Sequence, residues 1–297
     1  MLRREFIKYS IAAGGGALIL GQPYQVLGAQ PEAVVVTAGE PIDLLHTALQ
    51  PYGGIKQFIS KGDVVIIKPN MGWDRAPEFA ATTNPALIAE LTRLCYEAGA
   101  AKVKIFDRTC NNPQRCYQNS QIEASAKKLG AEVEQMRDFK FKKMALPSSK
   151  ILSEWPIYQD YLEADKVINV PIAKHHSLCN VTLGLKNLMG VMGGNRGEIH
   201  NSFRQKLIDI TAHLLPTLTI IDAYRILTRN GPSGGNLNDV KLAKTLILSS
   251  CPVSAEVLGL ELFQQDIKNV GYIQEAIERG LNKFDVTKLN VQRINLS

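Results

Sequence analysis

Several common binding signatures are missing from this sequence of 297 residues. Its five cysteines include no C-x-x-C pair, which argues against a ferredoxin-type cluster or a zinc ribbon. No P-loop or dinucleotide fingerprint follows a predicted strand. Basic residues exceed acidic ones by six, but they are spread along the chain instead of forming a block. We therefore expect no nucleic-acid partner.

The N-terminal segment, residues 1–29, has the pattern of an export signal. Arg3 and Arg4 stand before Lys8 and an apolar run, residues 11–20, that glycines interrupt. This pattern resembles a twin-arginine signal, which would make the twin-arginine export machinery a partner. The run is too short and too glycine-rich for a stable membrane span. We expect a periplasmic or extracellular protein, and leave open whether the signal is cleaved or kept as an anchor.

Residues 30–297 alternate between strand and helix patterns. Apolar, β-branched runs such as residues 64–67 and 103–106 are separated by helical stretches such as residues 86–98. This alternation predicts a single α/β domain with a mostly parallel sheet flanked by helices on both faces. In such sheets the ligand crevice lies beyond the carboxyl ends of the strands.

Polar side chains follow the predicted strands at five places. These are Lys68 with Asn70, Asp107, Lys174 with His176, Asp222, and the corner from Ser249 to Cys251. Because the carboxyl ends of parallel strands meet at one edge of a sheet, we expect all five groups to surround one cavity. Lysines dominate the set, so the cavity should be positively charged.

The segment 166–200 carries more reactive side chains per residue than any other part of the chain, including three of the five histidines. A buried strand is expected at its start, followed by Lys174 and His176. A helix should come next, with Thr182 and Lys186 on one face. The glycine-rich loop that follows can turn backbone N–H groups toward an anion.

These residues predict two kinds of role. Lys174 and His176 are assigned to acid/base catalysis, since surrounding cations would keep His176 neutral. The residues assigned to binding of a small anionic substrate are Lys68, Asn70, Lys186, Asn187, Asp107, Asp222 and His200. The alternative is that the lysines are surface charges and the asparagines cap turns.

A metal site is a second interpretation of the same residues. His176 and His200, with Asp107 or Asp222, have the donor types that zinc, iron or nickel accept. The sequence contains no H-x-x-x-H or H-E-x-x-H pattern, so we assign no metal ligand. Cys110 and Cys116 lie close together in sequence, and a disulfide and two free thiols both remain open.

The order of short motifs adds a family resemblance. The most specific are Lys68-Pro69-Asn70, Lys174-His175-His176 and Lys186-Asn187. Over about residues 34–280 this order resembles domain-of-unknown-function family 362. The resemblance implies an α/β domain, sometimes joined to an iron–sulfur ferredoxin module whose cysteine pattern this sequence does not contain, and it implies no defined activity. Where the family pattern has two aspartates after the last strand, this chain has Cys251 and Glu256, which argues against a divalent metal there.

Taken together, the residues predict an exported enzyme that performs acid/base chemistry on a small anionic substrate. The alternative is a non-catalytic binding protein for an anionic ligand or a metal. A third class, an assembly factor for a redox complex, is suggested by the export route alone. The substrate, the reaction, the cofactor and the oligomeric state are not indicated by the sequence.

Overall fold

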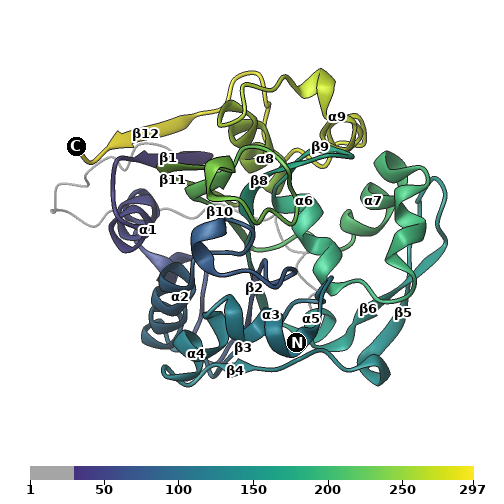
Figure 1. Ribbon diagram of the computed structural model, residues 1–297, viewed down its shortest axis with the longest axis horizontal. Coiled ribbons are helices and arrows are strands. Elements are labelled where there is room, and N and C mark those ends of the chain that lie inside the picture. Colours follow the sequence, from purple (N-terminus) through teal and green to yellow (C-terminus); the bar gives the residue numbers. More distant parts are fainter. Residues whose placement is uncertain (1–29) are drawn as a thin grey trace, which may run out of the picture.

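The structure is a computed structural model and describes residues 30–297 (Figure 1). The predicted export signal, residues 1–29, lies outside the described residues. Within residues 30–297, none of the helices is both long and apolar enough to cross a membrane.

A ten-stranded mixed sheet forms the centre of the molecule, with strand order β12-β1-β11-β10-β7-β2-β3-β4 and a hairpin, β8–β9, that joins at β10. The strands of this sheet are β1 Ala33–Thr37, β2 Val64–Pro69, β3 Lys102–Ile105, β4 Glu132–Val133, β7 Lys166–Val170, β8 Ile172–His176, β9 Asn180–Thr182, β10 Leu218–Leu227, β11 Val240–Ser249 and β12 Val291–Asn295. Pairing is parallel from β10 through β7, β2 and β3 to β4, as predicted. A separate hairpin pairs β5 Phe141–Ala145 with β6 Glu154–Tyr158.

Helices cover both faces of the sheet. Neighbouring residues of a strand point to opposite faces, so each strand contributes side chains to both cores. Val65 and Ile67 of β2 pack into one core with the helices α1 to α4, whereas Ile66 packs into the other core with α6 to α9. Both faces are therefore buried, which is why the strands are continuously apolar. The helices are α1 Pro41–Leu49, α2 Pro85–Glu97, α3 Pro113–Asn119, α4 Ile122–Lys127, α5 Gln159–Glu163, α6 Gly184–Asn187, α7 Phe203–Thr211, α8 Pro252–Glu261 and α9 Gly271–Glu278.

The last strands differ from the prediction. β11 runs antiparallel to β10, with Ser249 opposite Thr219 near the start of β10. The corner from Ser249 to Cys251 therefore lies at the edge of the sheet away from the carboxyl ends of the parallel strands, and its expected place in the cavity was wrong. The strand β12 was also missed; it pairs with β1 as an exposed edge and carries few apolar residues.

The segment after β7 is also built differently from the expected strand and long helix. Lys174 and His176 lie on the strand β8, and Thr182 lies on β9, which pairs with β8 antiparallel. Asn180 adopts a left-handed backbone, a conformation that asparagine accepts more readily than most residues. The helix α6 begins only at Gly184, so Thr182 and Lys186 do not share a helix face.

Candidate functional site

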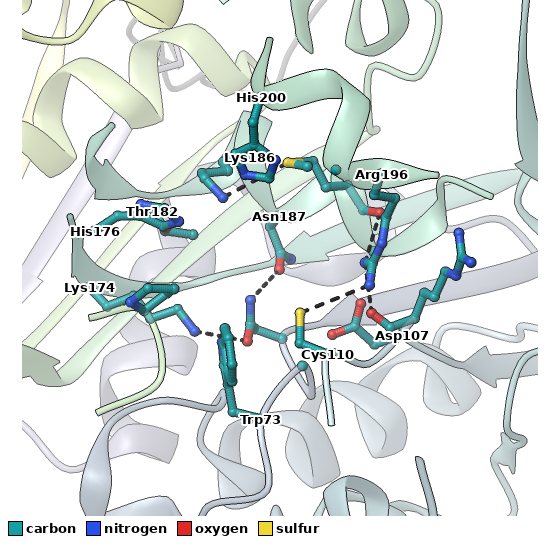
Figure 2. A pocket seen from close by; sticks show the side chains of 17 residues that line it. Trp73, Asp107, Cys110, Lys174, His176, Thr182, Lys186, Asn187, Arg196 and His200 are labelled. Atoms are coloured by element: carbon teal, nitrogen blue, oxygen red, sulfur yellow. Dashed lines mark hydrogen bonds between the residues drawn. The ribbon is translucent and has the colours of Figure 1, made fainter. Parts of the chain in front are cut away.

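A cavity of about 260 Å³ lies where β2 and β3 end, beside the β8–β9 hairpin (Figure 2). Its wall includes Asn70 and Trp73 after β2, Asp107, Arg108 and Cys110 after β3, Lys174 and His176 on β8, Thr182 on β9, Lys186 and Asn187 on α6, and Arg196 and His200 just before α7. The structure thus brings most of the predicted residues together from four strands and a short helix. This is the edge at which an α/β sheet is expected to hold a ligand.

Two of the residues predicted to bind the substrate, Lys68 and Asp222, are not among those lining the cavity. Lys68 is fully buried behind Asp107, with its Nζ 3.0 Å from Asp107 Oδ1. Burial lowers the pKa of Lys68, while the charge of Asp107 opposes that shift. Asp222 lies inside β10, because this strand continues past the predicted end, and its carboxylate accepts the backbone N–H of Asn84 at 2.7 Å. It holds the start of α2.

The asparagines form a chain of amide hydrogen bonds. Asn70 donates to Asn187 Oδ1 at 3.0 Å, and Asn187 donates to Asn169 Oδ1 at 2.9 Å and to the carbonyl of Lys68 at 3.1 Å. These bonds tie the end of β2 to α6 across β7. The amide of Asn187 is therefore largely used within the protein, and its main effect on the cavity is to fix the position of Asn70 and α6.

Lys174 is a buried ammonium that faces the cavity. Its side chain is 1% exposed, and Nζ donates to Asn70 Oδ1 at 3.1 Å and to the Ala81 carbonyl at 2.7 Å. Within residues 30–297 no carboxylate forms an ion pair with it. Burial, with the charge of Lys186 added, lowers the pKa of Lys174 to about 7. Near neutral pH this amine can exist in both protonation states.

His176, two residues further along β8, is neutral in these surroundings. Burial and the charges of Lys186 and Lys174 lower its pKa to about 3. Its Nδ1 accepts the backbone N–H of Leu178 at 3.1 Å, so the proton of the neutral ring is on Nε2. The ring is therefore a hydrogen-bond donor at Nε2. The neighbouring His175 accepts from the backbone N–H of Gly231 at 3.2 Å instead.

Three more cations in the wall, Lys186, Arg196 and Arg108, have no carboxylate partner among the described residues. Lys186 is half-buried, with Nζ 5.5 Å from the centre of the Phe203 ring, and burial lowers its pKa. Arg196 donates to the carbonyls of Arg108 and Thr109, each at 2.9 Å. Asp107, the carboxylate of the wall, is already paired with Lys68. The cavity therefore carries net positive charge.

The lining side chains that were not assigned to the site from the sequence include Trp73, Arg108 and Cys110. Each follows β2 or β3 closely, so position relative to a strand end was the signal that could have identified them. Cys110 is exposed and Cys116 is buried, and both thiols are free in the structure. His200 is exposed and lines the cavity, and its ring stacks on Phe203 with 5.6 Å between ring centres.

Glu256 and Cys251, the residues at the family's two aspartate positions, are both buried outside the cavity. Glu256 accepts the backbone N–H of Leu185 and the hydroxyl of Tyr272, the latter at 3.0 Å. Burial raises the pKa of Glu256 to about 8, so this carboxyl is protonated at neutral pH. Within residues 30–297, His, Cys, Asp and Glu side chains form no group of three or more suited to a metal ion.

Comparisons with known proteins find similarity along most of the chain. It is 26% identical over 253 residues to a thylakoid-associated protein of Synechocystis sp., which covers 82% of this chain and 77% of that protein. Among solved structures, the apoprotein of lactate racemase from Thermoanaerobacterium thermosaccharolyticum is similar, with a TM-score of 0.48 and 13% identity. That match covers 78% of this chain and 57% of the racemase chain, so this chain spans less than two thirds of the racemase.

The family resemblance noted in the sequence is confirmed by a direct match. The sequence model described as Domain of unknown function (DUF362) matches residues 65–261, which is more than half of the chain. The match spans the strands, turns and short helix that form the cavity, from β2 to α8. The chain therefore belongs to the DUF362 family.

Proposed function

We propose that this protein is an exported enzyme that transfers a proton to or from a small anionic substrate bound in the cavity. The observation that carries the proposal is Lys174, a buried amine that faces the cavity and forms no ion pair with a carboxylate of residues 30–297. A perturbed titratable group in a cleft is typical of a catalytic site. The twin arginines Arg3 and Arg4 support export from the cytoplasm, and residues 30–297 would form the mature α/β domain.

The anion would be held by the cations that lack a carboxylate. Lys186 and Arg196 supply charge from different parts of the wall. In a partly desolvated cavity such charges interact strongly with an anion, because water screens them poorly. Lys68 and Asn187 would act indirectly in this scheme, by holding Asp107, Asn70 and α6 in place.

Lys174 and His176 would do the acid/base work with separate roles. With a pKa of about 7, the amine of Lys174 can hold or release a proton near neutral pH, and it would transfer that proton to or from the substrate. The Nε2–H of His176 would donate a hydrogen bond to negative charge that develops on the substrate. His176 itself is a poor base in this state, because its Nδ1 already accepts a hydrogen bond from the backbone.

The test starts from binding, because the substrate is not known. Small carboxylates and phosphates are screened by thermal shift, and those that bind are incubated in D₂O and followed by NMR for exchange or conversion. Replacing Lys174→Met should reduce turnover at least about 100-fold, the usual contribution of an acid/base group. His176→Asn should have a similar effect on turnover and change affinity less than about threefold.

The exposed histidine His213 provides the control, since His213→Asn changes the same residue type outside the cavity. Full turnover in His176→Asn would contradict the role given to His176. Tight binding with no exchange or conversion of any ligand would favour the alternative, a non-catalytic binding protein for an anion. That alternative is supported by the many hydrogen bonds that already fix the cavity wall.

Export is tested separately by cell fractionation. Replacing Arg3 and Arg4 by lysine should leave the protein in the cytoplasm if the segment is a twin-arginine signal. Unchanged export of this variant would show that the arginines are not read by that machinery.

A further inference from the structure

Thr182, the last residue of β9, has a hydroxyl with an unmet hydrogen bond. Its side chain is 4% exposed, and Oγ1 has no hydrogen-bond partner in the described part of the chain. The same residue lines the cavity. A buried hydroxyl without a partner is unfavourable, and such groups are uncommon in folded proteins. A ligand in the cavity would be placed to supply the missing partner.

The β-sheet register sets what surrounds this hydroxyl. Thr182 is directly opposite Lys174 in the β8–β9 pair, and His176 is two residues along on the same side of β8. Side chains opposite each other in an antiparallel pair lie on one face, with Cβ atoms about 5 Å apart. In Figure 2, Thr182 lies beside His176, and Lys186 is on the adjacent wall. Thr182 is thus part of the wall that holds Lys174 and His176.

The neighbouring polar groups identify the kind of atom that would complete the bond. Lys174 and Lys186 are donors, and the neutral His176 presents its Nε2–H. A ligand atom that approaches all of these must be an acceptor, and next to the ammonium groups it would carry negative charge. The oxygen of a carboxylate or phosphate group meets both requirements. Such a group has at least two oxygens, so one can face Lys186 while another accepts from Thr182.

We propose that Thr182 is a further ligand-binding residue, whose hydroxyl donates a hydrogen bond to an oxygen of the ligand's carboxylate or phosphate group. This inference rests on the proposed function, since it names a contact made by the anion in the same cavity. The hydroxyl is unpartnered in the empty protein and is satisfied when the ligand is bound. Its removal should therefore favour the empty state and weaken the complex.

The structure offers a matched control for this effect. Thr219 is also buried, at 0% exposure, and its Oγ1 also has no partner in the described part of the chain, but it does not line the cavity. Thr182→Val and Thr219→Val remove the same hydroxyl with nearly the same shape. Both should raise the urea concentration at which the empty protein unfolds. Thr182→Val alone should weaken ligand binding.

The experiment measures binding of inorganic phosphate and of malonate to the full chain by titration calorimetry at pH 7. Thr182→Val should lower the affinity for the probe that binds by about tenfold, Thr182→Ser should stay within about threefold of the unsubstituted protein, and Thr219→Val should not differ. Thr182→Ala, which also lacks the hydroxyl, replaces the valine variant if that variant does not fold. The probe that binds distinguishes a phosphate from a carboxylate ligand.

Equal affinity of Thr182→Val, Thr219→Val and the unsubstituted protein would overturn the role of Thr182 and leave the anion site standing. Failure of the unsubstituted protein to bind either probe would overturn the proposed anion site and the role of Thr182 together. The two failures are therefore distinguishable in one set of titrations.

Discussion

Two clusters of charged side chains in this molecule are built on opposite plans. Between α7 and α9, Arg279 pairs with Asp209 at 2.5 Å and with Glu275 at 2.6 Å, and Glu275 also pairs with Arg204 and Lys150, each at 2.7 Å. In the cavity, Lys174, Lys186 and Arg196 form no ion pair with a carboxylate within residues 30–297. The first cluster is complete within the protein, and the second is not.

The pKa shifts show what the difference means. Burial alone would raise the pKa of Glu275, but hydrogen bonds from Lys150, Arg204 and Arg279 together lower it to about 2. Nothing comparable compensates Lys174, so burial lowers its pKa to about 7. Removing one partner from a neutralised buried pair lowers the stability of the folded protein, whereas a buried charge without a counter-ion itself lowers that stability until an anion binds. The two clusters should therefore respond to substitution in opposite ways.

The largest effect is expected from breaking the complete cluster at Asp209. This carboxylate is fully buried and accepts backbone N–H groups of Lys150, Ile151 and Leu152 as well as Arg279. Asp209→Asn should destabilise the protein by about 3–5 kcal/mol, since it removes a buried negative charge that Arg279 and three backbone N–H groups share. Urea denaturation measures this change, and affinity for anions should stay the same.

The exposed pair Arg293–Glu261, with both side chains 54% exposed, gives the control. Glu261→Gln should change stability by less than about 1 kcal/mol, as surface pairs usually do. If Asp209→Asn were as mild as this control, the cluster would not have the stabilising role described above.

A smaller effect of opposite sign is expected at Lys174. Lys174→Met should stabilise the empty protein at pH 6 by about 1–2 kcal/mol, near the low end of gains seen when buried ionic groups become apolar. Unfolded lysine has a pKa near 10.5 and folded Lys174 a pKa of about 7, so below pH 7 both states are charged and the folded state bears the full cost. Above pH 7 the folded state loses its proton and the cost decreases.

The gain from Lys174→Met should therefore be smaller at pH 9 than at pH 6. Urea denaturation of both proteins at the two pH values checks this. A loss of stability at pH 6, or an equal gain at both pH values, would mean that the ammonium is well compensated in the fold and that the contrast with Asp209 does not hold.

The smallest expected effect is a fraction of a proton taken up when an anion binds. Negative charge next to Lys174 should raise its pKa above 7, so at pH 8 the complex binds up to about one proton more than the empty protein. Calorimetry in buffers of different ionisation enthalpy measures this uptake. It should decrease at pH 6, where Lys174 is already charged, and disappear in Lys174→Met. Uptake that persists in that variant would place the proton on another group.

Local sequence patterns were sufficient to predict individual strands and helices. Residues 64–67 were predicted as a doubly buried strand, and β2 is one. The helical stretch over residues 86–98 was also predicted, and α2 spans Pro85–Glu97, with Asn84 Oδ1 accepting the N–H of Ala86 at 3.0 Å. The direction of β11 could not be predicted this way. It depends on the pairing of β11 with β1 and β10, and the three strands do not pair through local sequence alone. Because β11 is antiparallel to β10, Ser249 lies at the edge of the sheet away from the carboxyl ends of the parallel strands.

The same limit applies to the cavity. The gathering of Asn70, Asp107 and Lys174 was expected from strand ends, because neighbouring parallel strands share an edge. The ion pair between Lys68 and Asp107 could not be predicted from the sequence, because the two side chains meet only after β2 and β3 have paired. Thr182 was assigned to a helix because its spacing from Lys186 fits one, and the short β8–β9 hairpin overrode that local pattern.

Glu256 extends the boundary of the site beyond its surface. Its neutral carboxyl accepts the backbone N–H of Leu185, the residue just before Lys186, so α8 anchors the short turn that carries a cavity ammonium. Glu256, which does not line the cavity, thus helps to fix the position of Lys186, one of the cations that would bind the anion. In this family, comparing lining residues alone would overlook that dependence, and two proteins with identical pocket walls could still differ in which anions they accept.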